Sequence, residues 1–404
     1  LEYFKDKSII QVDTETEGGK NSIPNPHTHK VLCLQLGDSN NQFVIDTSIY
    51  SISLFKSILE DKSKIKIFKI QSKFSLTDPS KGVISEDALN TSVTTVAWLK
   101  RQSKAQAERK IEELIAHNLS SVHKLVERVS KQTEPLRMVR LSSDILPVYT
   151  EPNFGYVYKS STIRNFIESK LSVVGELARH SNVRLSFHPG QFCVLASDRP
   201  DVVERSIEDF EYHTDMARWM GYGSDWHDHG FKINVHIAGK SGADGIVNVL
   251  PKLSTEARNL ITIENEEISY GLDDCLKLVK HVPIVLDIHH YWIREGSYIQ
   301  PDDPRIRQVI DSWRGVRPTM HYSISREDLL PGHCPVTMPD MKNLLAQGHK
   351  KQKLRAHSDA YWNDAVNKYA VSFLQDFDIM CEAKFKNLAS FKLYENYVKP
   401  GVNT

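Results

Sequence analysis

Short apolar segments that each end on a histidine, aspartate or glutamate recur from the middle of the chain onward. Six such segments end at His188, His236, Glu264, Asp287 with His290, His321 and Glu382. Buried strands seldom end on ionisable side chains without a functional reason, because an unpaired buried charge costs free energy. The endings recur at intervals of roughly 20–60 residues, which predicts parallel strands that direct metal ligands toward one common point.

From Ile65 onward, strand-like segments alternate with helical patterns, as is typical of βα units and a parallel sheet. Eight candidate strands lie at 65–74, 137–144, 183–189, 233–239, 260–266, 283–289, 319–325 and 378–384. Helical patterns between them include 105–129, 162–180, 202–221 and 358–377. This alternation predicts an α/β fold, a (β/α)₈ TIM barrel over residues 65–404, whose active site lies on the loops after the strands. A smaller α+β segment is expected over residues 1–64.

Composition limits the classes of protein that this chain can represent. The 404 residues include 51 basic and 51 acidic side chains, so the formal net charge is zero and any DNA-binding face must be local. The five cysteines form no CxxC pair, which indicates a reducing, cytoplasmic compartment. No apolar run approaches the roughly 18 residues of a membrane span, and no signal-peptide pattern opens the chain. Leu1 stands in place of an initial methionine, which indicates a fragment or a processed product.

The residue types at the strand ends favour a divalent metal centre. Imidazole and carboxylate groups suit Zn, Mn or Fe. Cys381 is the one thiol at these positions, and strand alternation directs it away from the side of Glu382. Asp287 and His289 share a strand face, whereas His290 lies just past the strand, so the pattern leaves the choice between the two histidines open.

The chemistry depends on how many ions the centre holds. One ion with three ligands activates water by lowering its pKa. Seven or more ligands indicate two or three ions about 3.5–4 Å apart, an arrangement that suits attack on a phosphodiester. A sugar isomerase or epimerase can use two metals in the same kind of barrel. Ligand chemistry alone leaves both reactions open.

Several motifs resemble those of the UV damage endonuclease family. They are LNTSVTTVAWLKRQ, LRMVRLSSDILPVY, VRLSFHPGQF, VHIAGKSG, ITIENEE, VLDIHH, MHYSIS and CEAK, which occur in the family's order between Ile65 and Lys386. The resemblance implies a barrel of the endonuclease IV and xylose isomerase type, with a cluster of two or three divalent ions, Mn²⁺ being expected. It also implies a monomer that incises duplex DNA on the 5′ side of a UV photoproduct or another damaged base. A non-catalytic DNA-binding relative is a further alternative.

The same resemblance assigns roles to individual residues. It implies metal ligands at His188, His236, Glu264, Asp287, His290, His321, His357 and Glu382, with Glu151 as a ninth candidate where relatives often carry His. We expect a catalytic set of Glu264, Glu382, His236 and Lys384, with the two glutamates bridging ions. Lys384 lies two residues beyond Glu382 on the same strand face, so we expect it to meet a phosphate or an acidic ligand. Gln191 and Phe192 resemble a probe that enters the duplex at the lesion, and Phe192 stands where many members have Tyr. Thr319 occupies a position where many members carry Lys.

The amino-terminal segment resembles a different family. VDTETEGG is similar to the first motif of the 3′–5′ exonuclease domain of family A DNA polymerases, with Asp13 and Glu15 as its metal-binding carboxylates. These two residues share one face of a strand. The continuation departs from that family, since Ser75 appears in FKIQSKFSL where Asn and Asp are expected, and the later tyrosine-aspartate motif is absent. We therefore expect a truncated and inactive exonuclease-like segment.

Overall fold

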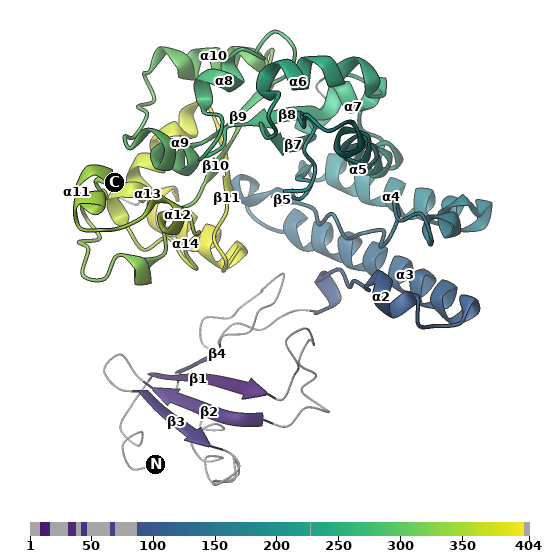
Figure 1. Ribbon diagram of the computed structural model, residues 1–404, viewed down its shortest axis with the longest axis horizontal. Helices are drawn as coiled ribbons and strands as arrows, with labels where there is room; N and C mark the ends of the chain where they lie inside the picture. Colours follow the sequence, from purple (N-terminus) through teal and green to yellow (C-terminus); the bar gives the residue numbers. More distant parts are fainter. Residues whose placement is uncertain are drawn as a thin grey trace. The chain divides into compact units, whose positions relative to one another are not determined.

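The computed structural model describes residues 9–16, 31–37, 42–46, 65–68, 87–226 and 228–399. The chain divides into two compact units, Leu1–Glu86 and Asp87–Thr404, each of which is described by itself (Figure 1). The barrel was expected to begin at residue 65, but the division between the units lies between Glu86 and Asp87.

The first unit contains a four-stranded sheet in the order β3-β2-β1-β4. Its strands are β1 (Ile9–Thr16), β2 (Val31–Gly37), β3 (Gln42–Asp46) and β4 (Ile65–Phe68). β2 pairs antiparallel with β1 and β3, whereas β4 runs parallel to β1. The prediction that the stretch from Ile65 forms the first barrel strand is therefore wrong. A short alternating pattern such as IKIF marks a strand without naming its partner, because pairing is decided by tertiary contacts.

The second unit is a parallel α/β barrel, as predicted, and the described residues contribute seven strands to it. The sheet follows chain order from β5 to β11, and every adjacent pair is parallel. Its strands are β5 (Met138–Arg140), β6 (Arg184–Phe187), β7 (Lys232–His236), β8 (Ile261–Glu264), β9 (Ile284–Asp287), β10 (Thr319–Tyr322) and β11 (Asp378–Cys381). Arg184 on β6, the neighbour of edge strand β5, pairs with Asp378 on the other edge strand, β11, at 2.6 Å, so the two sides of the sheet approach each other and the barrel is nearly closed.

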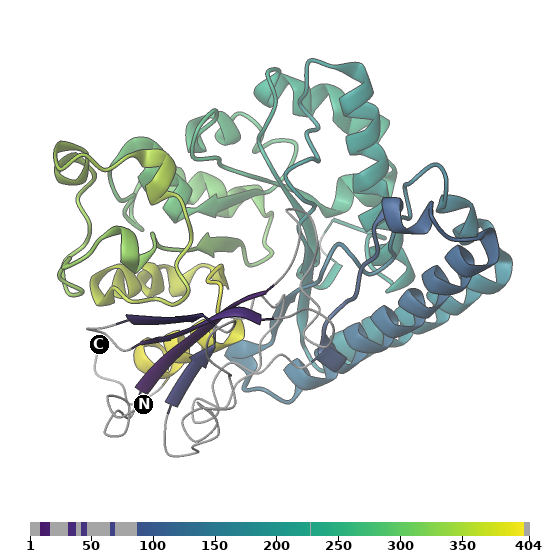
Figure 2. The same ribbon diagram turned by 60° about the horizontal axis from the view of Figure 1, so that its bottom comes forward.

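Helices precede, connect and follow the described strands of the barrel. They are α2 (Val96–Leu99), α3 (Lys104–Ser130), α4 (Ser161–His180), α5 (Pro200–Trp219), α6 (Gly242–Val249), α7 (Thr255–Leu260), α8 (Leu272–Leu276), α9 (Ile288–Glu295), α10 (Pro304–Ser312), α11 (Met341–Ala346), α12 (Lys351–Leu354), α13 (Asp364–Val371) and α14 (Asn387–Tyr397). The two longest amphipathic helices at the start, α3 and α4, pack against each other (Figures 1 and 2). None of the described helices is both long and apolar enough to cross a bilayer.

The composition of the strands explains why polar residues lie at the carboxyl-terminal end of the barrel. All four residues of β8 (ITIE) and of β9 (IVLD) are buried, as expected for parallel strands covered on both faces. In each strand the single ionisable residue is the last one. The apolar residues therefore anchor the strand in the core, and the carboxylate emerges at the carboxyl end, where barrel active sites lie.

Candidate metal centre

Seven of the predicted ligands form three overlapping groups at the carboxyl ends of the strands. The groups are His188, His236 and Glu264; then Glu264, Asp287 and His290; then Asp287, His321 and Glu382. Within each group the candidate ligand atoms lie within 4.8 Å of one another. Glu264 belongs to the first and second groups and Asp287 to the second and third, so the seven residues form one connected cluster, called here the metal centre.

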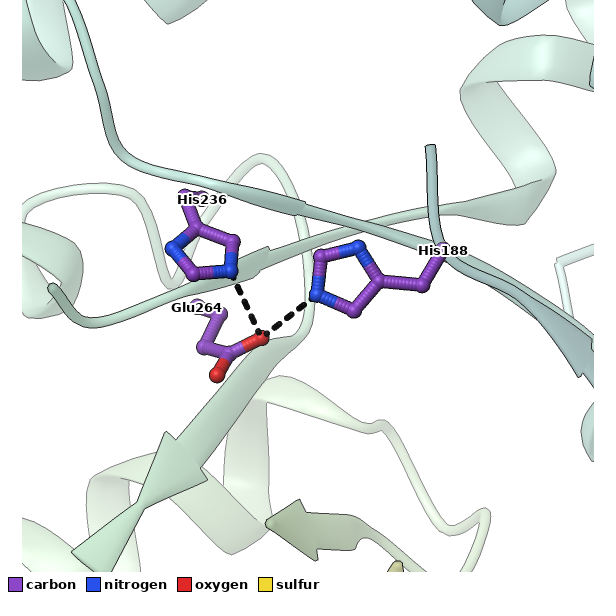
Figure 3. A group of neighbouring side chains, drawn as sticks. All are labelled: His188, His236 and Glu264. Atoms are coloured by element: carbon purple, nitrogen blue, oxygen red, sulfur yellow. Dashed lines mark ion pairs between the residues drawn. The ribbon is translucent and has the colours of Figure 1, made fainter. Parts of the chain in front are cut away.

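The first group converges on one carboxylate oxygen. Oε2 of Glu264 lies 3.3 Å from His188 Nε2 and 3.8 Å from His236 Nε2, with both rings turned toward it (Figure 3). His236 and Glu264 end neighbouring parallel strands and stand opposite each other in the β7–β8 register. Nδ1 of His188 lies 3.0 Å from the Pro189 carbonyl oxygen and donates to it, because a carbonyl oxygen can only accept. The lone pair of Nε2 then faces the metal centre and can bind a cation.

Glu264 lies among several histidines of the metal centre. It is fully buried, and its second oxygen, Oε1, lies 3.1 Å from His321 Nδ1 and 3.5 Å from His290 Nδ1. Burial raises the pKa of Glu264, but the nearby histidines, first His321 and then His236, outweigh it and hold the pKa well below its ordinary value. The carboxylate is therefore ionised and ready to bind a cation.

Two polar residues that sequence reasoning missed fix the orientation of Glu264. The Asn234 side-chain amide donates to Glu264 Oε2, and its carbonyl accepts from the Thr262 hydroxyl at 2.9 Å. Both residues lie two positions before a strand-end residue, Asn234 before His236 and Thr262 before Glu264, and so share its face of the strand. That alternation was the available signal for both.

Asp287 uses its two carboxylate oxygens differently. Oδ1 accepts from the main-chain N–H groups of His289 and His290, both at 2.7 Å, and so caps the start of α9. Oδ2 is buried and has no hydrogen-bond partner among the described residues. Burial raises the pKa of Asp287, while His290 opposes the rise. A buried carboxylate oxygen without a donor is unusual unless a cation coordinates it, so this atom fits a metal ligand.

The start of α9 decides between His289 and His290. Because the helix begins at Ile288, His290 turns back toward the centre, where its Nε2 lies 3.6 Å from Glu267 Oε2 and its Nδ1 donates to the Asn265 carbonyl. Burial lowers the pKa of His290, but Asp287, Glu264 and Glu267 outweigh it and raise the pKa to about 9. His289 instead lines a separate cavity of about 20 Å³ and stacks on Trp292. The geometry favours His290 as the ligand.

The third group is closed by an arginine that the sequence did not single out. His321 Nδ1 lies 3.4 Å from Glu382 Oε1, and the same oxygen accepts from Arg140 at the end of β5. Burial raises the pKa of Glu382, but Arg140 and then His321 outweigh it and lower the pKa far below its ordinary value. Arg140 thus neutralises the half-buried Glu382 carboxylate and links the first described barrel strand to the loop after the last.

Other predicted residues lie outside the three groups. His357 Nδ1 is 3.9 Å from Glu382 Oε2, at the margin of the metal centre. Glu151 accepts from the main-chain and side-chain nitrogens of Asn153, and Lys384 pairs with Asp359 at 3.5 Å. Thr319 is the first residue of β10, while His321 lies further toward its carboxyl end. Gln191 is exposed, and Phe192 is 85% exposed.

The donor set of the metal centre fits a cluster of divalent cations. It offers four imidazoles and three carboxylates and no thiolate. Cys381 is absent from all three groups, and burial raises the pKa of its thiol to about 12. Nitrogen and oxygen donors of this kind suit Mn²⁺, Zn²⁺ or Fe²⁺, and the set does not choose among them.

Comparisons with known proteins agree with this geometry. The family profile described as "UV-endonuclease UvdE" matches residues 80–401. The "UV-damage endonuclease" of Schizosaccharomyces pombe is 30% identical over 302 residues, which cover 71% of this chain and 44% of the relative. The "UV DNA damage endonuclease" of Bacillus cereus is 25% identical over 313 residues, or 74% of this chain and 87% of the relative.

A solved structure shares the barrel. The crystal structure of SacUVDE superposes with a TM-score of 0.57 at 22% identity and covers 75% of this chain and 91% of that chain. This likeness supports the fold. The match spans less than half of the Schizosaccharomyces pombe relative. The residues matched by the family profile lie almost entirely in the barrel unit, so the family assignment concerns that unit. The profile covers more than three-quarters of the sequence, and the chain therefore belongs to the UV damage endonuclease family, enzymes that incise DNA near UV photoproducts.

Proposed function

We propose that the barrel unit is a metal-dependent endonuclease that incises duplex DNA on the 5′ side of a UV photoproduct or another damaged base. The observation that carries this proposal is the sharing of Glu264 and Asp287 between neighbouring ligand groups. A centre linked in this way has donors for two or three cations rather than one. Closely spaced cations suit phosphodiester hydrolysis, because both the attacking and the leaving oxygen need charge stabilisation.

The residues of the metal centre have distinct roles in this proposal. The ligands are His188, His236, Glu264, Asp287, His290, His321 and Glu382, with His357 completing the set beside Glu382. Divalent cations, which we expect to be Mn²⁺, supply Lewis-acid polarisation of the phosphate and lower the pKa of bound water. Glu264 and Asp287 each belong to two of the ligand groups and would be shared between cations, whereas Glu382 is held by Arg140. Glu151 and Lys384 have other partners nearby and are assigned no ligand role.

The loop after β6 supplies a candidate lesion probe. Phe192 is 85% exposed, although its neighbour Cys193 is buried and Val194 N donates to the Ser206 hydroxyl on α5 at 2.8 Å. An exposed aromatic on an anchored loop suits insertion into a duplex, where it replaces stacking lost at a damaged pair. A sugar isomerase or epimerase needs a closed small-molecule pocket and no such wedge, so this exposure favours DNA as the substrate.

We further propose that the first unit is a truncated exonuclease-like fold without a complete two-metal site. Asp13 and Glu15 stand opposite Gln35 and Cys33 in the β1–β2 register and share one face of β1. Their side chains, and the stretch around Ser75, lie outside the described residues. In this proposal Asp13→Ala leaves every nuclease activity of the protein unchanged. A Mn²⁺-dependent 3′–5′ degradation that Asp13→Ala removes would contradict it.

The test of the endonuclease proposal is incision by the full chain loaded with Mn²⁺. UV-irradiated and untreated duplexes of one sequence are compared, with nicks mapped on each strand. We expect Mn²⁺-dependent nicks 5′ of photoproducts in the irradiated duplex only, and His236→Ala to abolish them. Bound metal without incision would overturn the proposal. A chain that binds DNA but no metal would be the non-catalytic relative.

The probe assignment needs its own measurement. Gln191→Ala should reduce the preference for irradiated over untreated duplex while the metal content of the protein stays the same. Loss of metal from Gln191→Ala would show that the loop supports His188 instead. Sedimentation of the same samples checks the expectation of a monomer.

A further inference from the structure

A pocket of about 350 Å³ lies beside the metal centre, between the loops that follow three consecutive strands. Glu267 and Ile268 line it from the loop after β8, and Arg294 lines it from the carboxyl end of α9. Lys351, Gln352 and Arg355 line it from α12 and the residue after it. Because β8, β9 and β10 are neighbours in the barrel, their loops meet at the face that carries the metal centre. We call this the α12 pocket.

The α12 pocket has a local excess of positive charge in a chain whose net charge is zero. Three cations line it, against the carboxylates of Glu267 and Glu295. The segment 350–355, KKQKLR, adds further cations and contains no acid. Of these, Lys350, Lys353 and Arg355 are exposed. Exposed cations gathered on one edge of an active face are the electrostatic footprint expected for a phosphate backbone.

The cations of the α12 pocket are held in place by main-chain contacts. Lys351 Nζ donates to the Arg294 carbonyl at 2.7 Å, and Arg294 Nη1 donates to the Ile268 carbonyl at 2.5 Å. These two bonds tie α12, α9 and the loop after β8 together. A guanidinium has five N–H donors, so Arg294 retains donors for a ligand after this contact. The head groups are therefore positioned before a ligand arrives, which reduces the entropy lost on binding.

One carboxylate connects the α12 pocket to the metal centre. Glu267 Oε1 lies 3.1 Å from Arg355 Nη1, and Glu267 Oε2 lies 3.6 Å from His290 Nε2. The side chain of Glu267 thus lies between the α12 pocket and the metal centre and contacts both. A strand whose scissile phosphate sits at the metal centre would bring a neighbouring phosphate to this wall.

We propose that the α12 pocket binds a backbone phosphate of the DNA strand near the scissile phosphate, with Arg294, Lys351 and Arg355 as its contacts. The inference rests on the proposed function, because it places the pocket along the substrate strand. It assigns the pocket to binding and positioning and leaves the reacting atoms to the metal centre. Inorganic phosphate has the same chemistry, so the experiment must separate the free ion from the strand.

A charge series at Gln352 tests the proposal without removing any of the three cations. Gln352 lines the pocket and is exposed, so Gln352→Glu adds one negative charge and Gln352→Lys one positive charge. The Mn²⁺-loaded full chain is assayed for incision of irradiated duplex and for binding to untreated duplex over a range of salt concentrations. The matched control is Gln308→Glu, the same substitution on the exposed side of α10 outside the pocket.

We expect Gln352→Glu to raise KM for irradiated duplex about 5- to 10-fold at low salt and to leave kcat and metal content within twofold. It should also reduce the slope of log affinity against log salt by about 0.9, the value for one lost phosphate contact. Gln352→Lys should lower KM and steepen the salt dependence, whereas Gln308→Glu should change neither KM nor the salt dependence. Equal KM values and slopes for Gln352→Glu and Gln308→Glu would overturn the pocket assignment.

The two readouts keep this proposal separate from the endonuclease proposal. Suppose that no variant incises DNA, but that Gln352→Glu alone lowers the DNA affinity and the slope of log affinity against log salt. The pocket assignment would then hold, and the proposed endonuclease activity would be wrong. Millimolar inorganic phosphate at constant ionic strength should raise the KM of the unmodified protein more than that of Gln352→Glu. Phosphate bound at the pocket with no effect on DNA affinity would assign the site to the free ion and overturn the strand assignment.

Discussion

The metal centre and the α12 pocket both place nitrogen groups beside carboxylates, and Glu267 of the pocket lies 3.6 Å from His290 of the metal centre, yet the two regions differ in how deeply their charged groups are buried. Glu264 and Asp287 are fully buried, and His321 is 3% exposed, whereas the side chain of Arg355 is 43% exposed. A buried charge needs a partner, since removing one member leaves the other uncompensated. An exposed charge is screened by water and salt and tolerates change.

This difference predicts how substitutions behave in the two regions. Changes at the metal centre should act on metal content and kcat together, because each ligand also compensates its neighbours. Changes at the α12 pocket should act on KM and on salt dependence, with metal content unaffected.

Glu264→Gln should have the largest effect. The substitution keeps the shape of the side chain but removes the charge shared by the first two ligand groups. We expect incision to fall by roughly 10³-fold or more, since several kcal/mol of transition-state stabilisation are lost. Metal content, measured by mass spectrometry of the purified protein, should fall in parallel.

A thermal melt provides the control for Glu264→Gln. Metal that binds only the folded state at a hundredfold excess over Kd stabilises it by about 2.7 kcal/mol. The unmodified protein should therefore melt roughly 5 °C higher with Mn²⁺ than with a chelator. Glu264→Gln should show no such shift. A normal shift together with lost incision would mean that Glu264 acts on the substrate rather than on metal binding.

Asn234→Leu should have the next largest effect. It removes the amide that donates to Glu264 and leaves the Thr262 hydroxyl without its acceptor. Loss of a residue that orients a ligand typically lowers metal affinity 10- to 100-fold. Titration with Mn²⁺ should show this decrease, and incision should recover at high Mn²⁺. Failure to recover would contradict a purely orienting role for Asn234.

These two residues illustrate what the sequence could and could not predict. Glu264 was predictable because a run of buried apolar residues ends on it, and the barrel followed from the repetition of such runs. Asn234 has a detectable position two residues before His236, but the identity of its partner depends on the β7–β8 register. Arg140 contacts Glu382 across 242 residues, and no local pattern encodes a contact made by closing the barrel.

Two further features required the tertiary structure. The choice of His290 over His289 depends on where α9 begins, and a helix start at Ile288 cannot be read from strand alternation. The strand at Ile65 was recognised as a strand but placed in the wrong sheet, because four alternating residues fit β1 as well as a barrel neighbour. The α12 pocket is lined by the loop after β8 and by residues of α9 and α12, and it has no sequence signature beyond its cluster of lysines.

Arg355→Gln should have a smaller effect, confined to substrate binding. The substitution removes one cation from the α12 pocket and the partially exposed pair with Glu267. We expect KM for irradiated duplex to rise about 3- to 5-fold, the size of an exposed ion pair of up to about 1 kcal/mol. Lys353→Gln removes an exposed cation of α12 that does not line the pocket and should change KM less than twofold. Loss of metal from Arg355→Gln would place Arg355 with the metal centre through Glu267.

Lys384→Ala should have the smallest effect, and it tests where the metal centre ends. The sequence predicts that Lys384 meets a phosphate or an acidic ligand, because it lies two residues beyond Glu382 on the same strand face. Its ammonium instead pairs with Asp359 at 3.5 Å, and the two side chains are 51% and 53% exposed. An ion pair so exposed is strongly screened, so we expect kcat and KM to stay within twofold of the unmodified protein. Asp359→Asn, which frees Lys384 from its partner, is the matched control and should behave alike. A tenfold loss of kcat in Lys384→Ala alone, with metal content intact, would extend the catalytic machinery to Lys384 and restore the role that the sequence predicts.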